Sequence, residues 1–286
     1  MNLFAAMVLT FVVQSAATFP ANWTTPIPPF HIVGNIYYVG TEDLASYFIS
    51  TPAGGILIET GVEPNVETVA RNIATLGFKV TDVKYLLTTQ AHFDHVGGHA
   101  KMKELSGAQI VVSEGDAQVV EDGGRSDYHF GATYRFRPAH VDRRIQDGDT
   151  VRLGGTVLTA HLTPGHTKGC TTWTMEVKDA GGRVRHVVFA GSTTVNDGVK
   201  LVDNAQYPRI AEDYRRTFAI LGSLPCDVFL AAHGSQMEDF DAKAAAARRG
   251  ETPGPFVDPE ALRAYVRASQ QAFETKLGQQ KTSPSR

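Results

Sequence analysis

Apolar runs bounded by turn residues alternate with segments of helical spacing in the first half of the chain. Residues 30–39 and 47–59 are rich in Ile, Val, Tyr and Phe, and glycines and a proline break the second run at residues 51–55, so both predict strands. Apolar positions then recur at helical spacing over residues 66–76, before the strand-like run 83–88. A strand, a helix and a strand in this order predict a parallel crossover, whose ligands gather beyond the carboxyl ends of the strands.

The same alternation continues to the end of the chain. Further strands are predicted over residues 109–113, 150–153, 156–162, 171–177, 184–190 and 227–232. Helices are predicted over residues 100–105, 116–120, 210–221 and 259–277. Two halves of this kind predict an α/β protein with two β-sheets face to face and helices outside. No linker separates the halves, so we expect a single domain over residues 18–286.

Residues 123–141 contain six aromatic or imidazole side chains without a clear period. A long aromatic loop inside a compact domain is typical of a flap over a binding site, although an unordered surface loop is the alternative.

Residues 1–17 carry no charged side chain and contain an apolar run followed by Gln14-Ser15-Ala16-Ala17. This predicts a secretory signal peptide cleaved near Ala17, and therefore a periplasmic protein. A hydrophobic first strand or a membrane anchor is the alternative, but the run is short for a bilayer. We expect no membrane contact after cleavage.

Composition narrows the class of partner. The 286 residues are 42% hydrophobic and 20% charged, as in ordinary globular proteins, and the formal net charge is -3. No long basic run is present, so nucleic acid is not an expected partner, and we expect a monomer that binds a small molecule. The only cysteines, Cys170 and Cys226, exclude a disulfide framework and are assigned to packing.

Candidate metal ligands cluster where the apolar run 83–88 gives way to a helical pattern. Two imidazoles and a carboxylate within four residues suit zinc, and two more histidines each end an apolar run beside a glycine. With a nearby glutamine, the six candidate ligands are Gln90, His92, Asp94, His95, His166 and His233. Six ligands are enough for two metal ions that each keep an open position for water. Because a bound divalent ion lowers the pKa of its water to about 7, the cluster predicts a hydrolase. Histidines scattered by chance are the alternative, which the clustering disfavours.

The signature Gln90-x-His92-x-Asp94-His95, with His166 and His233, resembles the metallo-β-lactamase superfamily, and within it most resembles the B3 subclass. The resemblance runs from about residue 31 to the last helix. It includes three more specific segments: Leu201-Val202-Asp203-Asn204, Tyr207-Pro208 and Glu212-Asp213-Tyr214-Arg215. The fold that it implies is a four-layer αβ/βα sandwich with a metal site at one edge.

The resemblance also implies two zinc sites. Gln90, His92 and His166 form the first ligand set, and Asp94, His95 and His233 form the second. Most of the subclass has histidine in place of Gln90. An amide oxygen is a weaker zinc donor than imidazole, so we expect the first zinc to be held less tightly, and one or two zinc ions in the working enzyme.

The implied activity is hydrolysis of the β-lactam amide of penicillins, cephalosporins and carbapenems by a metal-bound hydroxide, which confers antibiotic resistance. Asp94 would bind the second zinc and orient the nucleophile. Ser192 stands where related hydrolases carry a metal-bridging aspartate. With Thr194, it is expected to bind the substrate carboxylate, a simple turn residue being the alternative. A lactonase or thioester hydrolase of the same fold, and a non-enzymatic metal-binding protein, are the other hypotheses.

Overall fold

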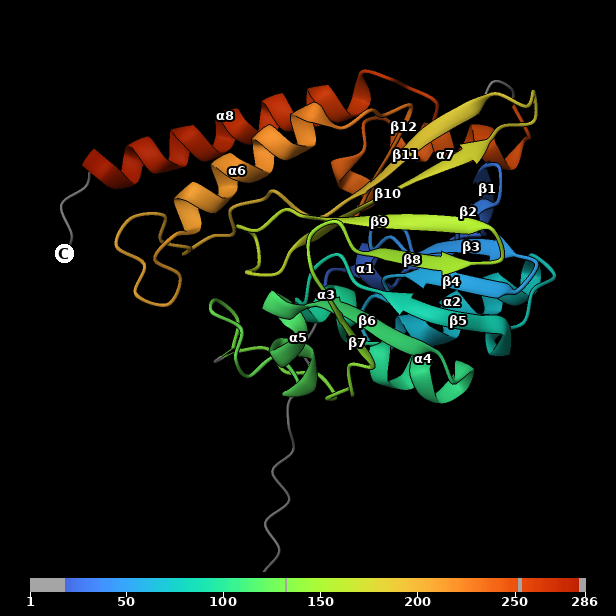
Figure 1. Cartoon of the computed structure of the whole chain (residues 1–286), viewed down its shortest axis with the longest axis horizontal. Coiled ribbons are helices and arrows are strands. Elements are labelled where there is room, and N and C mark those ends of the chain that lie inside the picture. Colours follow the sequence, from blue (N-terminus) through green and yellow to red (C-terminus); the bar gives the residue numbers. More distant parts are fainter. Residues whose placement is uncertain (1–18, 132, 252–253, 283–286) are drawn as a thin grey trace, which may run out of the picture.

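Two mixed β-sheets lie face to face, and helices cover their outer faces (Figure 1). The computed structural model describes residues 19–131, 133–251 and 254–282, so the predicted signal peptide, residues 1–17, lies outside the described residues. The sheets and helices form the predicted αβ/βα sandwich, and the predicted fold class is confirmed.

The first sheet has seven strands in the order β1 to β7. They are β1 (Phe30–Val33), β2 (Ile36–Tyr38), β3 (Tyr47–Thr51), β4 (Gly54–Ile58), β5 (Val83–Leu87), β6 (Gln109–Ser113) and β7 (Arg143–Ile145). Strands β1 to β4 pair antiparallel, whereas β4 to β7 pair parallel. The predicted strand over residues 30–39 is wrong in one respect, because it is a hairpin. Gly34 has a φ of 57°, which suits a glycine in a tight turn, and Phe30 pairs with Tyr38.

The second sheet has five strands in the order β12-β11-β10-β9-β8. They are β8 (Thr150–Leu153), β9 (Thr156–Leu162), β10 (Thr171–Lys178), β11 (Val184–Ala190) and β12 (Val228–Ala231). Strands β8 to β11 pair antiparallel, and β11 pairs with β12 in parallel. Strands β9, β11 and β12 therefore run in the same direction, and their carboxyl ends meet at one edge of the sheet.

Helices α2, α4 and α5 cover the first sheet, and α6 and α8 cover the second (Figure 1). The helices are α1 (Ala21–Thr24), α2 (Asn65–Thr75), α3 (Phe93–Val96), α4 (His99–Ser106), α5 (Glu114–Glu121), α6 (Ile210–Ser223), α7 (Phe240–Arg248) and α8 (Ala261–Thr282), with short 3₁₀ turns η1 (Val80–Asp82) and η2 (Gly234–Gln236). No helix within the described residues is long and apolar enough to cross a membrane.

Two apolar cores hold these layers together. The larger core lies between the sheets and continues under α6 and α8, with Trp173 fully buried in it. The smaller core lies between the first sheet and its helices, where α2 buries Val66, Val69 and Ile73 at helical spacing. Burial of each such side chain contributes about 1.5–3 kcal/mol. The larger core contains residues from both halves of the sequence.

One end of the sandwich brings the two sheets into direct contact. The Trp173 indole donates a hydrogen bond to the carbonyl of Thr88, 3.1 Å away, and the Thr171 N–H donates to the carbonyl of Thr89. At this end β5 leads into the zinc motif, β9 into the His166 turn, β11 into the Ser192 turn and β12 into His233. The candidate ligands of both halves therefore lie at one end of the molecule.

Candidate metal centre

A one-turn helix, α3, presents the central part of the motif. His92 precedes it with extended backbone (φ -73°, ψ 152°), while Asp94 and His95 lie within it. The buried carboxylate of Asp116 holds this turn against the turn that carries His166. Its Oδ2 accepts hydrogen bonds from the Ala91 N–H (3.0 Å) and the Thr167 hydroxyl (2.6 Å). Burial raises the pKa of Asp116, although these bonds favour its charged form.

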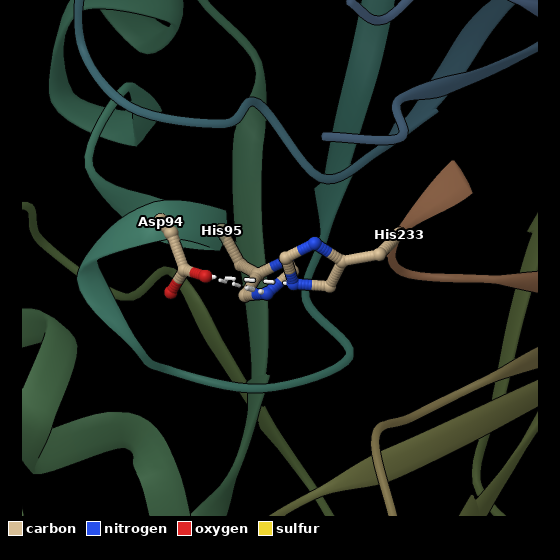
Figure 2. Close-up of side chains that lie close together, drawn as sticks. All are labelled: Asp94, His95 and His233. Atoms are coloured by element: carbon tan, nitrogen blue, oxygen red, sulfur yellow. Dashed lines mark ion pairs between the residues drawn. The ribbon is translucent and has the colours of Figure 1, made fainter. Parts of the chain in front are cut away.

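The second ligand set converges at one point, although its members come from both ends of the sequence. Asp94, His95 and His233 each offer a ligand atom, and these atoms lie within 4.8 Å of one another. Asp94 Oδ2 is 3.3 Å from His95 Nε2 and 3.5 Å from His233 Nε2. Figure 2 shows the carboxylate and the two rings directed toward one another. Such a group of two imidazoles and a carboxylate fits zinc.

The structure also brings together two members of the first ligand set. His92 Nδ1 lies 3.0 Å from His166 Nε2, and the two rings meet edge to face. Gln90 is buried, but neither its amide oxygen nor its amide nitrogen has a hydrogen-bond partner within the described residues. The assignment of Gln90 to zinc stays a prediction. A bound cation would give its unpaired oxygen a partner.

Each histidine also presents its second ring nitrogen to an oxygen acceptor. His92 Nε2 lies 3.3 Å from Asp127, His95 Nδ1 3.2 Å from Glu59, and His233 Nδ1 2.9 Å from Asp43. His166 Nδ1 lies 2.6 Å from the backbone carbonyl of Thr194. Such acceptors hold the proton on one nitrogen and leave the other free to bind a metal. The sequence analysis identified none of these partners.

The carboxylates of the site favour positive charge on the histidines of the second ligand set. Burial disfavours charge on His95, but Asp94 and Glu59 outweigh it and raise its pKa to about 10. Burial also works against charge on His233, yet Asp43 and Asp94 raise its pKa. His166 has no such partner, and burial together with His92 lowers its pKa, so it is neutral and able to bind metal.

The carboxylates around the six candidate ligands lack the usual counterions. Asp43, Glu59, Asp94, Asp116 and Asp127 have little-exposed side chains, and within the described residues no lysine or arginine forms an ion pair with any of them. The positively charged partners that the described residues offer are histidines, which must be neutral to bind a metal. The residues therefore fit divalent metal ions, which would bind in the two ligand sets and supply the missing positive charge.

A cavity of about 460 Å³ is lined by four of the six candidate ligands, His92, Asp94, His166 and His233. Both predicted substrate contacts, Ser192 and Thr194, line it. Ser192 Oγ also accepts a hydrogen bond from the Thr194 N–H at 3.3 Å, so this serine both stabilises its own turn and faces the cavity. Phe130 and Tyr134 line the same cavity, which agrees with the predicted flap over residues 123–141.

Several lining residues were not predicted. Trp23 and Phe93 form an aromatic wall, with ring centroids 6.1 Å apart, and Asn196 and Gln236 offer side-chain amides. Polar residues in loops between strands give no distinct sequence signal. Glu59 had a weak signal, since it ends an apolar strand next to the one that leads to Gln90.

The fold and the ligand geometry define a metal-dependent hydrolase, and comparison with known proteins gives its family. The Metallo-beta-lactamase superfamily profile matches residues 40–233, so the chain belongs to the metallo-β-lactamase superfamily. Within it, the resemblance to subclass B3 is confirmed by solved structures.

Two of these structures cover almost the whole chain. The native FEZ-1 metallo-beta-lactamase from Legionella gormanii is 46% identical, with a TM-score of 0.89, over 93% of this chain and 100% of that chain. The class B3 di-zinc metallo-beta-lactamase LRA-12 from an Alaskan soil metagenome is 39% identical, with a TM-score of 0.86, over 92% and 99%.

Curated relatives are more distant. A hydroxyacylglutathione hydrolase of Rhodopseudomonas palustris is 26% identical over 242 residues, which are 85% of this chain and 82% of that protein. The chain spans about half the length of two other curated relatives, 40% of a probable metallo-hydrolase of Burkholderia pseudomallei and 54% of a hydroxyacylglutathione hydrolase of Bradyrhizobium.

Proposed function

We propose that the protein is a zinc-dependent β-lactamase, which hydrolyses the ring amide of penicillins, cephalosporins and carbapenems. The observation that carries the proposal is the turn after β11, which places Ser192 rather than a carboxylate beside the ligands. Related hydrolases that act on thioesters have a metal-bridging aspartate in this turn. The neutral hydroxyl of Ser192 would instead contact the substrate, as the resemblance to subclass B3 implies.

Zinc in the two ligand sets would supply a water of lowered pKa and a Lewis acid for the carbonyl oxygen. Asp94 Oδ2 faces His95 and His233, whereas Asp94 Oδ1 makes no hydrogen bond within the described residues. Oδ1 can therefore accept a hydrogen bond from the attacking water and hold it in line with the carbonyl. Ser192 and Thr194 can each donate a hydroxyl hydrogen bond to the substrate carboxylate.

The lining of the cavity also supports a substrate with little charge. Apart from the candidate ligands and Asp43, the cavity is lined by hydroxyls, amides and aromatic rings, and no lysine or arginine is among its lining residues. A β-lactam carries one carboxylate, which neutral donors and a metal can satisfy. A glutathione thioester carries two carboxylates and an ammonium group. The identity to hydroxyacylglutathione hydrolases favours a thioester hydrolase as the second candidate, but this lining does not.

A substrate panel on purified, zinc-loaded protein tests the proposal. It should contain a penicillin, a cephalosporin, a carbapenem, an acyl-homoserine lactone and a glutathione thioester. We expect kcat/KM above about 10⁴ M⁻¹ s⁻¹ for at least one β-lactam, a usual value for an enzyme acting on its own substrate. Dipicolinate should abolish this activity and added zinc restore it. A lactone or thioester hydrolysed about 100-fold faster than every β-lactam would overturn the proposal.

We further propose export to the periplasm after cleavage near Ala17, where a monomer would meet antibiotics entering the cell. The composition of residues 1–17 supports this. Amino-terminal sequencing of protein from the periplasmic fraction should begin near Thr18, and light scattering should give the mass of one chain. Protein that retains Met1 in the cytosol would contradict the export step. In cells, expression should raise the β-lactam concentration needed to stop growth.

A further inference from the structure

A tight turn within the aromatic loop, residues 126–131, contacts both histidines of the first ligand set. The Tyr128 hydroxyl donates a hydrogen bond to the backbone carbonyl of His166 at 3.1 Å. The Phe130 ring lies 4.8 Å from the His92 ring, edge to face. In the same turn, Asp127 Oδ2 lies 3.3 Å from His92 Nε2. Three side chains of one turn therefore contact the first ligand set.

Asp127 also forms hydrogen bonds within its own turn. Its other oxygen, Oδ1, accepts hydrogen bonds from the N–H groups of His129 (2.7 Å) and Phe130 (2.5 Å). These bonds hold the backbone in the turn that places Phe130 against His92. The side chains of Asp127 and His92 are only 5% and 2% exposed, so little water competes for the contacts. One carboxylate thus shapes the turn and orients a ligand.

The orientation that results is the one a metal requires. The Asp127 carboxylate, 3.3 Å from Nε2, favours the proton on that nitrogen, and the lone pair of Nδ1 then faces His166 Nε2, 3.0 Å away. An imidazole rotated away from Asp127 would lose this arrangement.

The second ligand set does not depend on this turn. His95 contacts Glu59, which follows β4, and His233 contacts Asp43, which precedes β3. Within the described part of the chain, no hydrogen bond or ion pair joins residues 126–131 to Asp94, His95 or His233. The first ligand set is therefore held by a loop, while the second is held by segments beside the sheet strands.

We propose that Asp127 is a positioning residue that couples the order of the turn 126–131 to zinc binding in the first ligand set. The proposal rests on the zinc sites of the proposed function but not on the identity of the substrate. Coupling between two binding events is reciprocal, so zinc in the first set stabilises the turn, and a ligand held against Phe130 tightens that zinc. Partners that orient a metal-binding histidine typically change metal affinity by about 10–100-fold.

Asp127→Asn tests this coupling. An amide has one acceptor oxygen and no charge, so it can keep the hydrogen bonds to the turn or an acceptor facing His92, but not both. Titration against a chromophoric chelator should show the weaker zinc equivalent bound about 10–100-fold less tightly, with the tighter equivalent unchanged. Tyr128→Phe, which loses the hydroxyl contact with His166, should weaken the same equivalent to a smaller extent.

Hydrogen exchange of residues 126–131 supplies a readout other than activity. In the parent, the weaker zinc equivalent, which binds the first ligand set, should slow hydrogen exchange of the His129 and Phe130 amides. In Asp127→Asn this slowing should disappear. Asp122→Asn is the matched control. Asp122 accepts hydrogen bonds from the Arg125 and Ser126 N–H groups nearby but contacts no candidate ligand, so it should behave as the parent.

Three results would overturn the coupling. The first is an Asp127→Asn protein that binds both zinc equivalents within about threefold of the parent, less than the effect expected of such a partner. The second is hydrogen exchange at residues 126–131 of the parent that does not respond to the weaker zinc equivalent. The third is an Asp122→Asn protein whose zinc affinity falls as much as that of Asp127→Asn. If Asp127→Asn does not fold, Tyr128→Phe decides by the same measurements. None of them uses β-lactam hydrolysis, so failure of the proposed substrate leaves the test intact.

Discussion

Replacing Gln90 with leucine should stabilise the zinc-free protein and weaken its first zinc site. The Gln90 amide is 1% exposed, and neither of its polar atoms has a hydrogen-bond partner within the described residues. Removal of an unsatisfied buried amide should raise the free energy of unfolding by about 1–3 kcal/mol, because folding no longer removes that polar group from water without a hydrogen-bond partner. Leucine is similar in size and fits a helix or a turn without β-branching. Opposite effects on folding and on metal binding are expected of a residue retained for its ligand role.

The magnitudes can be measured separately. For a domain of this size, 1 kcal/mol corresponds to about 2–4 °C in Tm, so a gain of about 1–3 kcal/mol should make the zinc-free Gln90→Leu protein melt about 2–12 °C higher than the parent. Loss of a direct ligand should weaken the first zinc by at least about 100-fold, the upper end of the range seen for indirect partners. Gln90→His should have the opposite effect on zinc, since imidazole is a better donor than an amide oxygen.

Scanning calorimetry of metal-free protein and titration against a chelator of known zinc affinity test both parts. A Gln90→Leu protein that melts lower than the parent would show that the amide has a partner in the folded chain. An unchanged affinity for both zinc equivalents would show that Gln90 is not a ligand. Either result would refute the reasoning about this residue.

Three further predictions concern the neighbouring groups. Asp94→Asn keeps the shape of the side chain but loses its charge, so kcat should fall by about 10²–10⁴ with an unchanged circular dichroism spectrum, and a fall of less than tenfold would exclude the proposed role. Ser192→Ala should raise KM about tenfold with little change in kcat, because a carboxylate contact is present in ground state and transition state alike; steady-state kinetics that show only a lower kcat would contradict this. The pKa of His95 is about 10 in the metal-free protein, so His95 is protonated at neutral pH, and zinc binding to the second set must release that proton. Calorimetry in buffers of different ionisation heat should show at least one proton released near pH 7, because the pKa of His233 is also raised, and progressively less release as the pH rises through about 10; zinc affinity that does not rise with pH below this value would contradict the assignment.

The fold was predictable because each element has a local pattern. Helix α2 was predicted within one residue of its ends, since its buried positions recur at helical spacing and Gly77, with a φ of 86°, follows it. The error at residues 30–39 has a local cause. Apolar residues flank Gly34 and Asn35 on both sides, and the hairpin signal of these two turn residues was outweighed by the hydrophobicity of the whole run.

The candidate metal ligands could be predicted from the sequence, but the groups that orient them could not, because these groups are distant from the ligands in the sequence. Four ligand positions lie within six residues, and the two distant histidines each lie beside a glycine shortly after an apolar strand, which gives a local signal. The groups that orient these ligands have no such signal. Asp43 is 190 positions from His233, and the two meet only because the loop before β3 lies beside the end of β12. Asp127 was within the predicted flap, but its role depends on the distance to His92.

The buried carboxylates give a physical reason to expect two metal ions rather than one. Asp43, Glu59, Asp94, Asp116 and Asp127 carry up to five negative charges at one end of the sandwich, and no described lysine or arginine is paired with them. One divalent ion would leave most of this charge to be balanced by protonated histidines, which could then not bind metal. Two divalent ions balance four of these five charges, so most of the candidate histidine ligands can remain neutral. The negative charge that the chain gathers around its ligands therefore favours filling the weaker first site, even though Gln90 is the poorer donor.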